Sequence, residues 1–182
     1  VERPAVVGNS LGGRLAVGLA EVGRAESIVL VSPAGLTEPA TWLKALPRFR
    51  LPEVEVDPRA YVEMVLAQIF ARPLTDPRTA PLAQAEREAL ARVSFAEFLQ
   101  GSARCLAEMA KEVPPSARLR SLPGRGLIWG REDRLIPLEV AAALGRIWPS
   151  ALLEVLEDSG HVPQLETPDA FAAALSRCLG AA

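Results

Sequence analysis

Short apolar runs alternate with helix-length amphipathic segments at both ends of the chain. Residues 5–8 and 27–31 are almost wholly apolar, which is typical of strands covered on both faces. Residues 11–22 between them have helical spacing, with Leu15, Leu19 and Val22 near one face, and Gly23 ends the segment as a C-cap. Strand, helix and strand at this spacing predict a right-handed βαβ unit and a parallel sheet.

The middle of the chain has a different pattern. No strand is predicted between residues 36 and 117. Apolar spacing and proline positions instead predict helices at about 38–45, 58–70, 81–92 and 94–112, with Asp57 as an N-cap. Apolar residues in these helices, such as Tyr61, Phe95 and Phe98, are expected to contact neighbouring helices; the alternative is that some line a substrate cavity.

The alternation of strands and helices resumes near the C-terminus. Strands are predicted at 126–130 and 152–156, and helices at 138–148 and 168–179, the last with Thr167 as N-cap and Gly180 as stop. We therefore predict an α/β fold whose core comprises residues 1–35 and 118–182. An all-helical insertion at residues 36–117 interrupts this core.

Composition and charge narrow the classes of function. The 182 residues are 49% hydrophobic and 23% charged, enough for one domain with a sizeable core. A net charge of −2 gives no sign of nucleic-acid binding, and no apolar run reaches the length of a membrane span. We expect a cytoplasmic protein with no nucleic-acid or membrane partner. Cys105 and Cys178 fall in predicted helices, where small buried thiols are expected.

Gly8-Asn9-Ser10-Leu11-Gly12 joins the first predicted strand to the first predicted helix. Such a strand, turn and helix with serine at the apex form a G-x-S-x-G nucleophile elbow. The glycines are expected where the strand and helix backbones approach too closely for side chains, with Gly12 and Ala16 letting the helix lie against the sheet. Ser10 would stand at a helix N-terminus, where free N–H groups favour developing negative charge.

Two further residues complete a chemical set with Ser10. Asp133 and His161, the only histidine, each follow a predicted strand. Because open parallel sheets place their sites at the carboxyl ends of strands, we expect the three side chains to meet. Histidine can take the serine proton, and the carboxylate can orient the imidazole. Glu132 is a competing acid, ranked behind Asp133.

Two other carboxylates near the histidine receive structural interpretations. Asp158 lies three residues before His161 and is read as a turn or capping residue. Glu166 is expected to cap or pair near the start of the last helix rather than react.

Three ordered motifs, GNSLGG at 8–13, WGREDRLIP at 129–137 and GHVPQLETP at 160–168, together resemble the C-terminal part of the α/β-hydrolase superfamily. The resemblance covers essentially the whole chain and implies that Ser10 is the nucleophile, Asp133 the acid and His161 the base. It also implies that the backbone N–H of Leu11 is an oxyanion-hole donor. The insertion at 36–117 stands where that family carries a helical cap.

The family also has strands and helices before the elbow and a second oxyanion donor there. We therefore expect this sequence to be a fragment of a longer hydrolase, with N-terminal strands missing and activity impaired. The strand at 5–8 would have an exposed edge, which favours self-association. A separate chain that supplies the missing strands is the alternative partner.

The resemblance implies a serine hydrolase that cleaves a small ester or related acyl substrate through an acyl-enzyme, without metal or organic cofactor. GNS-x-GG is similar to the carbon–carbon hydrolases of ring-fission products, although Val162 stands where those enzymes often have an aromatic residue. A non-catalytic member that binds a small ligand in the same pocket is a further alternative. Ser10 argues against the dehalogenase and epoxide hydrolase branches, which use a carboxylate nucleophile.

Overall fold

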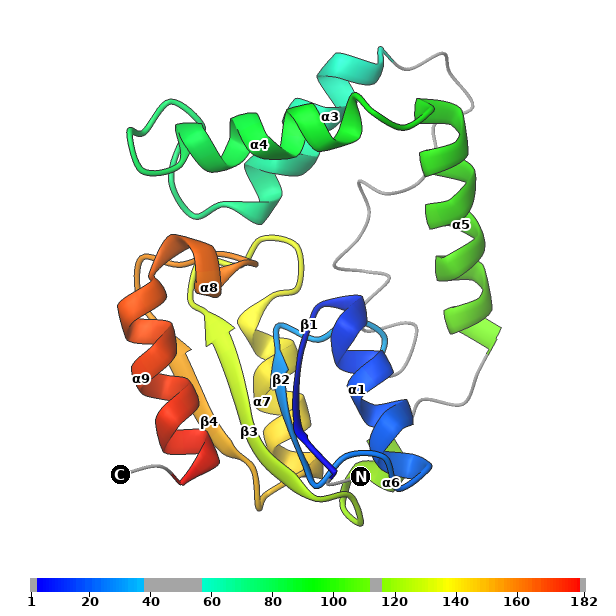
Figure 1. Cartoon of the computed structure of the whole chain (residues 1–182), viewed down its shortest axis with the longest axis vertical. Coiled ribbons are helices and arrows are strands. Elements are labelled where there is room, and N and C mark those ends of the chain that lie inside the picture. Colours follow the sequence, from blue (N-terminus) through cyan, green and yellow to red (C-terminus); the bar gives the residue numbers. More distant parts are fainter. Residues whose placement is uncertain (1–2, 38–56, 112–115, 181–182) are drawn as a thin grey trace.

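A four-stranded parallel sheet forms the centre of the molecule. The computed structural model describes residues 3–37, 57–111 and 116–180 (Figure 1). The strands pair in chain order, β1 (Ala5–Asn9), β2 (Ser27–Val31), β3 (Gly124–Gly130) and β4 (Leu152–Leu156). The helices are α1 (Leu11–Glu21), α3 (Pro58–Ile69), α4 (Ala80–Leu90), α5 (Phe95–Lys111), α6 (Ser116–Leu119), α7 (Leu138–Ile147), α8 (Pro163–Glu166) and α9 (Pro168–Leu179).

The predicted parallel α/β arrangement is confirmed, and the element bounds agree closely with expectation. The predicted helix at 38–45 lies outside the described residues. The one-turn helices α6 and α8 were not predicted, because four residues are too short to show a helical period. None of the helices in the described ranges combines the length and the apolar character that a membrane crossing requires.

Helices cover both faces of the sheet. Successive side chains of β2 point to opposite faces and pack in two different clusters. Ile28 and Leu30 pack in one cluster with α1, α6 and α7, whereas Val29 and Val31 pack in another with α9. Helices α3, α4 and α5, here called the upper helices, lie beyond the carboxyl ends of the strands (Figure 1). The sheet therefore presents its carboxyl edge to a separate helical layer.

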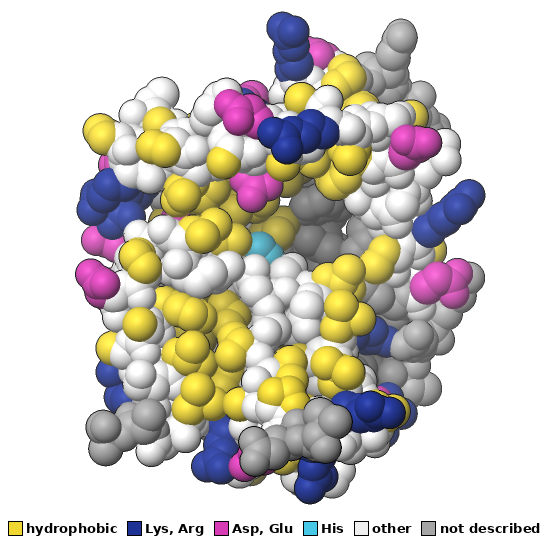
Figure 2. Space-filling view, in the orientation of Figure 1, with side chains coloured by type: hydrophobic (Ala, Val, Ile, Leu, Met, Phe, Trp, Pro, Cys, Tyr) yellow, Lys and Arg dark blue, Asp and Glu magenta, His cyan; other side chains and the backbone are white. Residues whose placement is uncertain are grey.

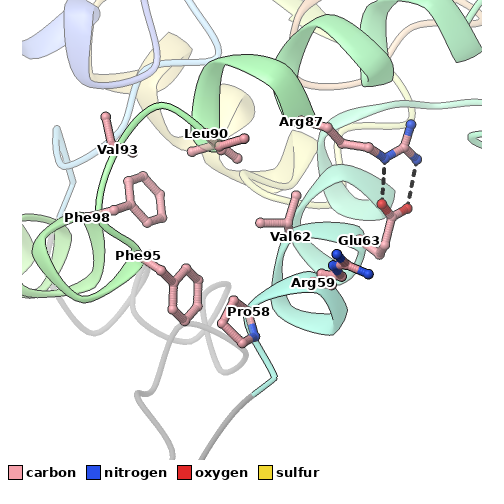
Figure 3. Close-up of a pocket in the computed structure, with 10 residues that line it drawn as sticks. Pro58, Arg59, Val62, Glu63, Arg87, Leu90, Val93, Phe95 and Phe98 are labelled. Atoms are coloured by element: carbon pink, nitrogen blue, oxygen red, sulfur yellow. Dashed lines mark hydrogen bonds and ion pairs between the residues drawn. The ribbon is translucent and has the colours of Figure 1, made fainter.

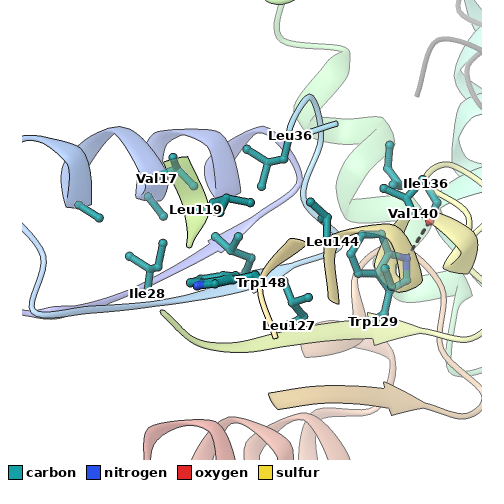
Figure 4. Packing of buried hydrophobic residues seen from close by; sticks show 14 of the residues in the cluster. Val17, Ile28, Leu36, Leu119, Leu127, Trp129, Ile136, Val140, Leu144 and Trp148 are labelled. Carbon is teal, nitrogen blue, oxygen red and sulfur yellow. Dashed lines mark hydrogen bonds between the residues drawn. The ribbon is translucent and has the colours of Figure 1, made fainter. Parts of the chain in front are cut away.

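Two buried tryptophans dominate the larger cluster (Figure 4). Trp129 on β3 and Trp148 after α7 are both fully buried. Gly124 at the start of β3 makes room for Trp148, since a Cβ at this glycine would collide with the indole ring. The indole N–H of Trp129 donates to the carbonyl of Ile136 at 2.8 Å, which anchors the loop after β3.

Helix α1 packs through its small residues rather than its large ones. Ala16, Val17 and Ala20 are buried against the sheet, whereas Leu15 and Val22 are 66% and 70% exposed. The leucine-rich face of α1 lies exposed. Among the described strands, β1 pairs only with β2. A short distance between helix and sheet favours small side chains at the contact, and this leaves the large apolar residues outside.

The predicted helix ends are confirmed at Gly23 and Gly180, which have φ of 69° and 72°. The predicted N-cap is confirmed at Asp57, whose carboxylate accepts a hydrogen bond from the amide of Arg59. Thr167 occupies the N-cap position of α9, but its side chain makes no capping hydrogen bond. Its hydroxyl instead contacts the Ser159 hydroxyl at 3.2 Å.

The two cysteines differ in environment. Cys178 on α9 is buried against β3, and burial raises the pKa of its thiol, which makes it inert at neutral pH. Cys105 on α5 is only half-buried, so the expectation of a buried thiol is met at Cys178 alone.

Candidate active site

Ser10 forms a sharp turn between β1 and α1. Its φ of 53° and ψ of −122° lie in a region that costs free energy for any residue with a side chain. Three backbone hydrogen bonds hold this conformation: the Ser10 amide donates to Val31 at 2.9 Å, and its carbonyl accepts from Gly13 and Ala34 at 3.0 Å each. A strained serine held this firmly is the expected geometry of a nucleophile elbow.

The crowding expected at the elbow is found at Gly8 and Gly13 but not at Gly12. A Cβ on Gly8 would collide with the Gly12 carbonyl, and a Cβ on Gly13 would lie 2.6 Å from the Pro33 Cβ. At Gly12 a Cβ would meet nothing within 4 Å. The prediction for Gly12 was therefore wrong: Gly13 is the residue that lets the helix approach the loop after β2.

Leu11 is the first residue of α1, directly after Ser10. The N–H groups in the first turn of a helix have no partner within that helix and point out along its axis. This position is suited to a negatively charged oxygen near Ser10. The role of Leu11 as an oxyanion-hole donor stays a prediction.

Asp133 lies in the loop after β3, and its two carboxylate oxygens have different partners. Oδ1 accepts hydrogen bonds from the amides of Leu135 and Ile136 at 2.9 and 2.8 Å. Oδ2 lies 2.9 Å from Nδ1 of His161. The loop thus fixes one oxygen and leaves the other for the imidazole. The side chain is fully buried, so water does not compete for that contact.

The competing carboxylates do not contact the imidazole. Glu132 accepts a hydrogen bond from the backbone amide of Ser159 at 2.9 Å, so it braces the loop that carries His161. Asp158 has φ of 57° and stands in the turn after β4, as expected, with its carboxylate 3.1 Å from the Arg72 guanidinium. Of these three acidic residues, the structure brings only Asp133 to His161.

His161 is 3% exposed and lies beside a hollow between the upper helices and the sheet, where Figure 2 shows the chain's one histidine. Its Nε2 is buried and has no hydrogen-bond partner among the described residues. When Nδ1 carries the proton toward Asp133, Nε2 holds a free lone pair. That nitrogen is the atom available to accept a proton.

Asn9 connects the elbow to the histidine loop, a role that the sequence did not reveal. Its side-chain amide donates to the carbonyls of Val31 and His161 at 3.1 and 3.0 Å. Because Asn9 precedes Ser10, these bonds tie the end of β1 to the backbone of His161. The one available signal was its position: it is the only asparagine and stands inside the elbow motif.

Glu166 was expected to cap or pair near the start of the last helix rather than react. Its carboxylate does bind backbone amides, but those amides do not belong to the last helix. Glu166 is the last residue of α8, and its two oxygens accept hydrogen bonds from the amides of Gly160 and Ala71 at 2.8 and 2.7 Å. The short helix α8 intervenes before α9, so the carboxylate of Glu166 turns back toward the histidine loop.

A cavity of about 370 Å³ lies among the upper helices (Figure 3). Its apolar wall includes side chains from α3, α4 and α5, namely Val62, Leu90, Phe95 and Phe98. None of Ser10, Asp133 and His161 lines it. Phe95 also packs edge-on against Tyr61 at a ring distance of 5.5 Å, so helix contact and cavity lining coexist. A role for this cavity in substrate binding stays a prediction.

The described parts of the chain contain no group of three or more His, Cys, Asp or Glu side chains that could hold a metal ion.

Comparison with known proteins finds similar chains among hydrolases. A 2-hydroxymuconate semialdehyde hydrolase from Pseudomonas putida is 29% identical over 94% of this chain and 60% of its own length. A 2-hydroxy-6-oxo-6-phenylhexa-2,4-dienoate hydrolase from Rhodococcus sp. strain RHA1 superposes with a TM-score of 0.73 and 23% identity, over 99% of this chain and 65% of that one.

A thermophilic esterase from Thermogutta terrifontis superposes with a TM-score of 0.69 and 20% identity, over 97% of this chain and 64% of that one. The chain thus spans about 60% to 65% of the length of these proteins. Residues 1–174 match the model of the alpha/beta hydrolase family. The chain belongs to the alpha/beta hydrolase family.

Proposed function

We propose that this protein is a serine hydrolase that cleaves a small ester or related acyl compound. The observation that carries the proposal is the His161 imidazole, held by Asp133 at Nδ1 and left without a partner at a buried Nε2. Asn9 ties the backbone of that histidine to the strained elbow of Ser10. This arrangement supports a nucleophile, a base and an orienting acid on one edge of the sheet.

In the proposed reaction, Ser10 Oγ attacks the acyl carbon while its proton moves to Nε2 of His161. The resulting oxyanion is stabilised by the Leu11 N–H at the start of α1. The leaving alkoxide takes the proton from Nε2, and the acyl group remains on Ser10. Water then attacks the acyl-enzyme, Nε2 again takes the proton and returns it to Ser10 Oγ, and the carboxylic acid departs. Asp133 Oδ2 stabilises the imidazolium in both halves of the cycle.

The upper helices would act as the cap that selects the substrate. They lie beyond the carboxyl edge of the sheet, across the hollow beside His161 (Figures 1 and 2). Substrate size would follow from their side chains.

A second candidate is hydrolysis of a carbon–carbon bond in a ring-fission product. The specific observation in its favour is the 29% identity to a hydrolase of 2-hydroxymuconate semialdehyde. The same three residues would serve either reaction. Carbon–carbon hydrolases often have an aromatic residue directly after the histidine, where this chain has Val162. We therefore rank the ester reaction first.

A substrate panel separates these functions. Purified protein would be assayed with p-nitrophenyl esters of increasing acyl length and with a 2-hydroxy-6-oxo-hexadienoate, whose absorbance falls on cleavage. We expect slow ester turnover that peaks at short chains and is lost in Ser10→Ala. Faster cleavage of the dienoate would favour the carbon–carbon reaction. Binding of these compounds without turnover of either class would contradict both and support the non-catalytic alternative.

A further inference from the structure

The C-terminal end of α3 is joined by hydrogen bonds to both loops of the candidate triad. From the acid loop, the Arg134 guanidinium donates to the carbonyls of Ala67, Phe70 and Ala71 at 3.2, 3.2 and 3.0 Å. These carbonyls lie in or just after the last turn of α3, where backbone acceptors lack helical partners. From the base loop, the His161 amide donates to the Ile69 carbonyl at 2.7 Å.

Glu166 lies at the centre of this junction. One carboxylate oxygen accepts from the amide of Gly160, the residue before His161, and the other accepts from the amide of Ala71, just beyond α3. The two backbones are in direct contact, because a Cβ on Gly160 would collide with the Ile69 carbonyl. One side chain therefore connects the histidine loop to the upper helices.

A carboxylate is a costly group in this place. Glu166 is half-buried, and desolvation raises its pKa, against the opposing effects of the backbone amides and the positive charge of Arg72. Burying a carboxylate costs free energy that a neutral side chain would avoid. Only a carboxylate, however, offers an acceptor oxygen to both amides at once; glutamine can serve one and would turn its own NH₂ toward the other.

We propose that Glu166 is a positioning residue that couples the docking of α3 to the orientation of the His161 imidazole. The proposal rests on the serine hydrolase function, in which Nε2 must face the Ser10 hydroxyl. With α3 docked, Glu166 holds the Gly160 amide and the Ile69 carbonyl holds the His161 amide, so the backbone on both sides of the imidazole is fixed. When these bonds are lost, the imidazole loses its fixed approach to Asp133 and Ser10.

The single histidine allows a direct test. In tag-free protein, every imidazole resonance in an NMR spectrum belongs to His161. We expect the Nδ1–H signal of Glu166→Gln and Glu166→Ala to shift and broaden relative to the unsubstituted protein. The matched control is Glu154→Gln. Glu154 lies on β4, away from the junction, and its carboxylate accepts from the Arg177 guanidinium on α9. This control should leave the imidazole spectrum unchanged.

Arg134→Ala gives a second route to the same effect. Its side chain is exposed, so its truncation removes three hydrogen bonds to α3 without opening a core cavity. We expect the same imidazole change as in the Glu166 variants. An unchanged His161 spectrum in folded Glu166→Gln and Arg134→Ala would overturn the proposal.

Ester kinetics provide the functional readout. Because small displacements of a catalytic group reduce chemistry more than binding, we expect kcat to fall about 10- to 100-fold in Glu166→Gln with little change in KM. A rise in KM with kcat unchanged would count against the proposal. If the unsubstituted protein turned over no ester, the proposed function would fail, and the imidazole spectrum alone would decide whether Glu166 positions His161.

Discussion

His161→Ala is expected to abolish ester turnover while leaving the protein folded. The imidazole is the only candidate base, and its Nε2 is the proton acceptor in both steps of the proposed reaction. In a serine protease, loss of the histidine lowers kcat by about 10⁶-fold, because the serine hydroxyl alone is a weak nucleophile. The measurement is the initial rate with a short-chain p-nitrophenyl ester.

The fold of His161→Ala can be checked independently of its rate. The backbone amide and carbonyl of His161 make their own hydrogen bonds to Ile69 and Asn9, and the substitution leaves both in place. Circular dichroism should therefore stay near that of the unsubstituted protein, whereas the urea midpoint should fall modestly because the buried Oδ2 of Asp133 loses its partner. Turnover by the variant at the original rate would contradict the assignment of His161 as base.

Trp148→Ala is expected to lower the free energy of unfolding by about 3–5 kcal/mol, the usual cost of removing a buried tryptophan. The indole is fully buried and packs over Gly124, which has no side chain to fill the space it would leave. Small domains are stabilised by only about 5–15 kcal/mol, so the loss would be a large share of the total. Urea unfolding followed by tryptophan fluorescence or circular dichroism would measure it.

Two comparison variants define the packing effect. Trp148→Phe keeps a ring in the site and removes an indole N–H that has no hydrogen-bond partner among the described residues, so it should cost much less than alanine. Leu15→Ala, on the exposed face of α1, should change the free energy of unfolding by under about 0.5 kcal/mol. Equal losses in Trp148→Ala and Leu15→Ala would show that the core is not where the structure places it.

The helices and strands, and the order of the candidate site residues along the chain, could be predicted because their signals are local. The apolar run of β2, the turn at Ser10 and the position of Asp133 and His161 after strands each depend on a few neighbouring residues. The face that α1 buries could be predicted only in part: Ala16 was expected against the sheet and is buried there, whereas Gly12 was the wrong companion. The close approach of helix and sheet selects the small residues Ala16 and Ala20, although the leucines form the stronger apolar stripe.

The contacts that hold the histidine in place were beyond the reach of the sequence. Glu166 accepts from Ala71, and Asn9 donates to His161, across 95 and 152 positions of the chain. No periodicity or local motif encodes such pairs; they arise only when two loops and the end of α3 meet at the edge of the sheet. The partners of Glu166 could not be predicted for this reason.

The nucleophile is the central claim, and covalent labelling tests it most directly. Purified protein would be treated with a fluorophosphonate and analysed by peptide mass spectrometry, with Ser10→Ala as the matched control. The account predicts one adduct, on the peptide that contains Ser10, and none in the variant. A folded protein that forms no adduct, or an adduct that persists in Ser10→Ala, would contradict it.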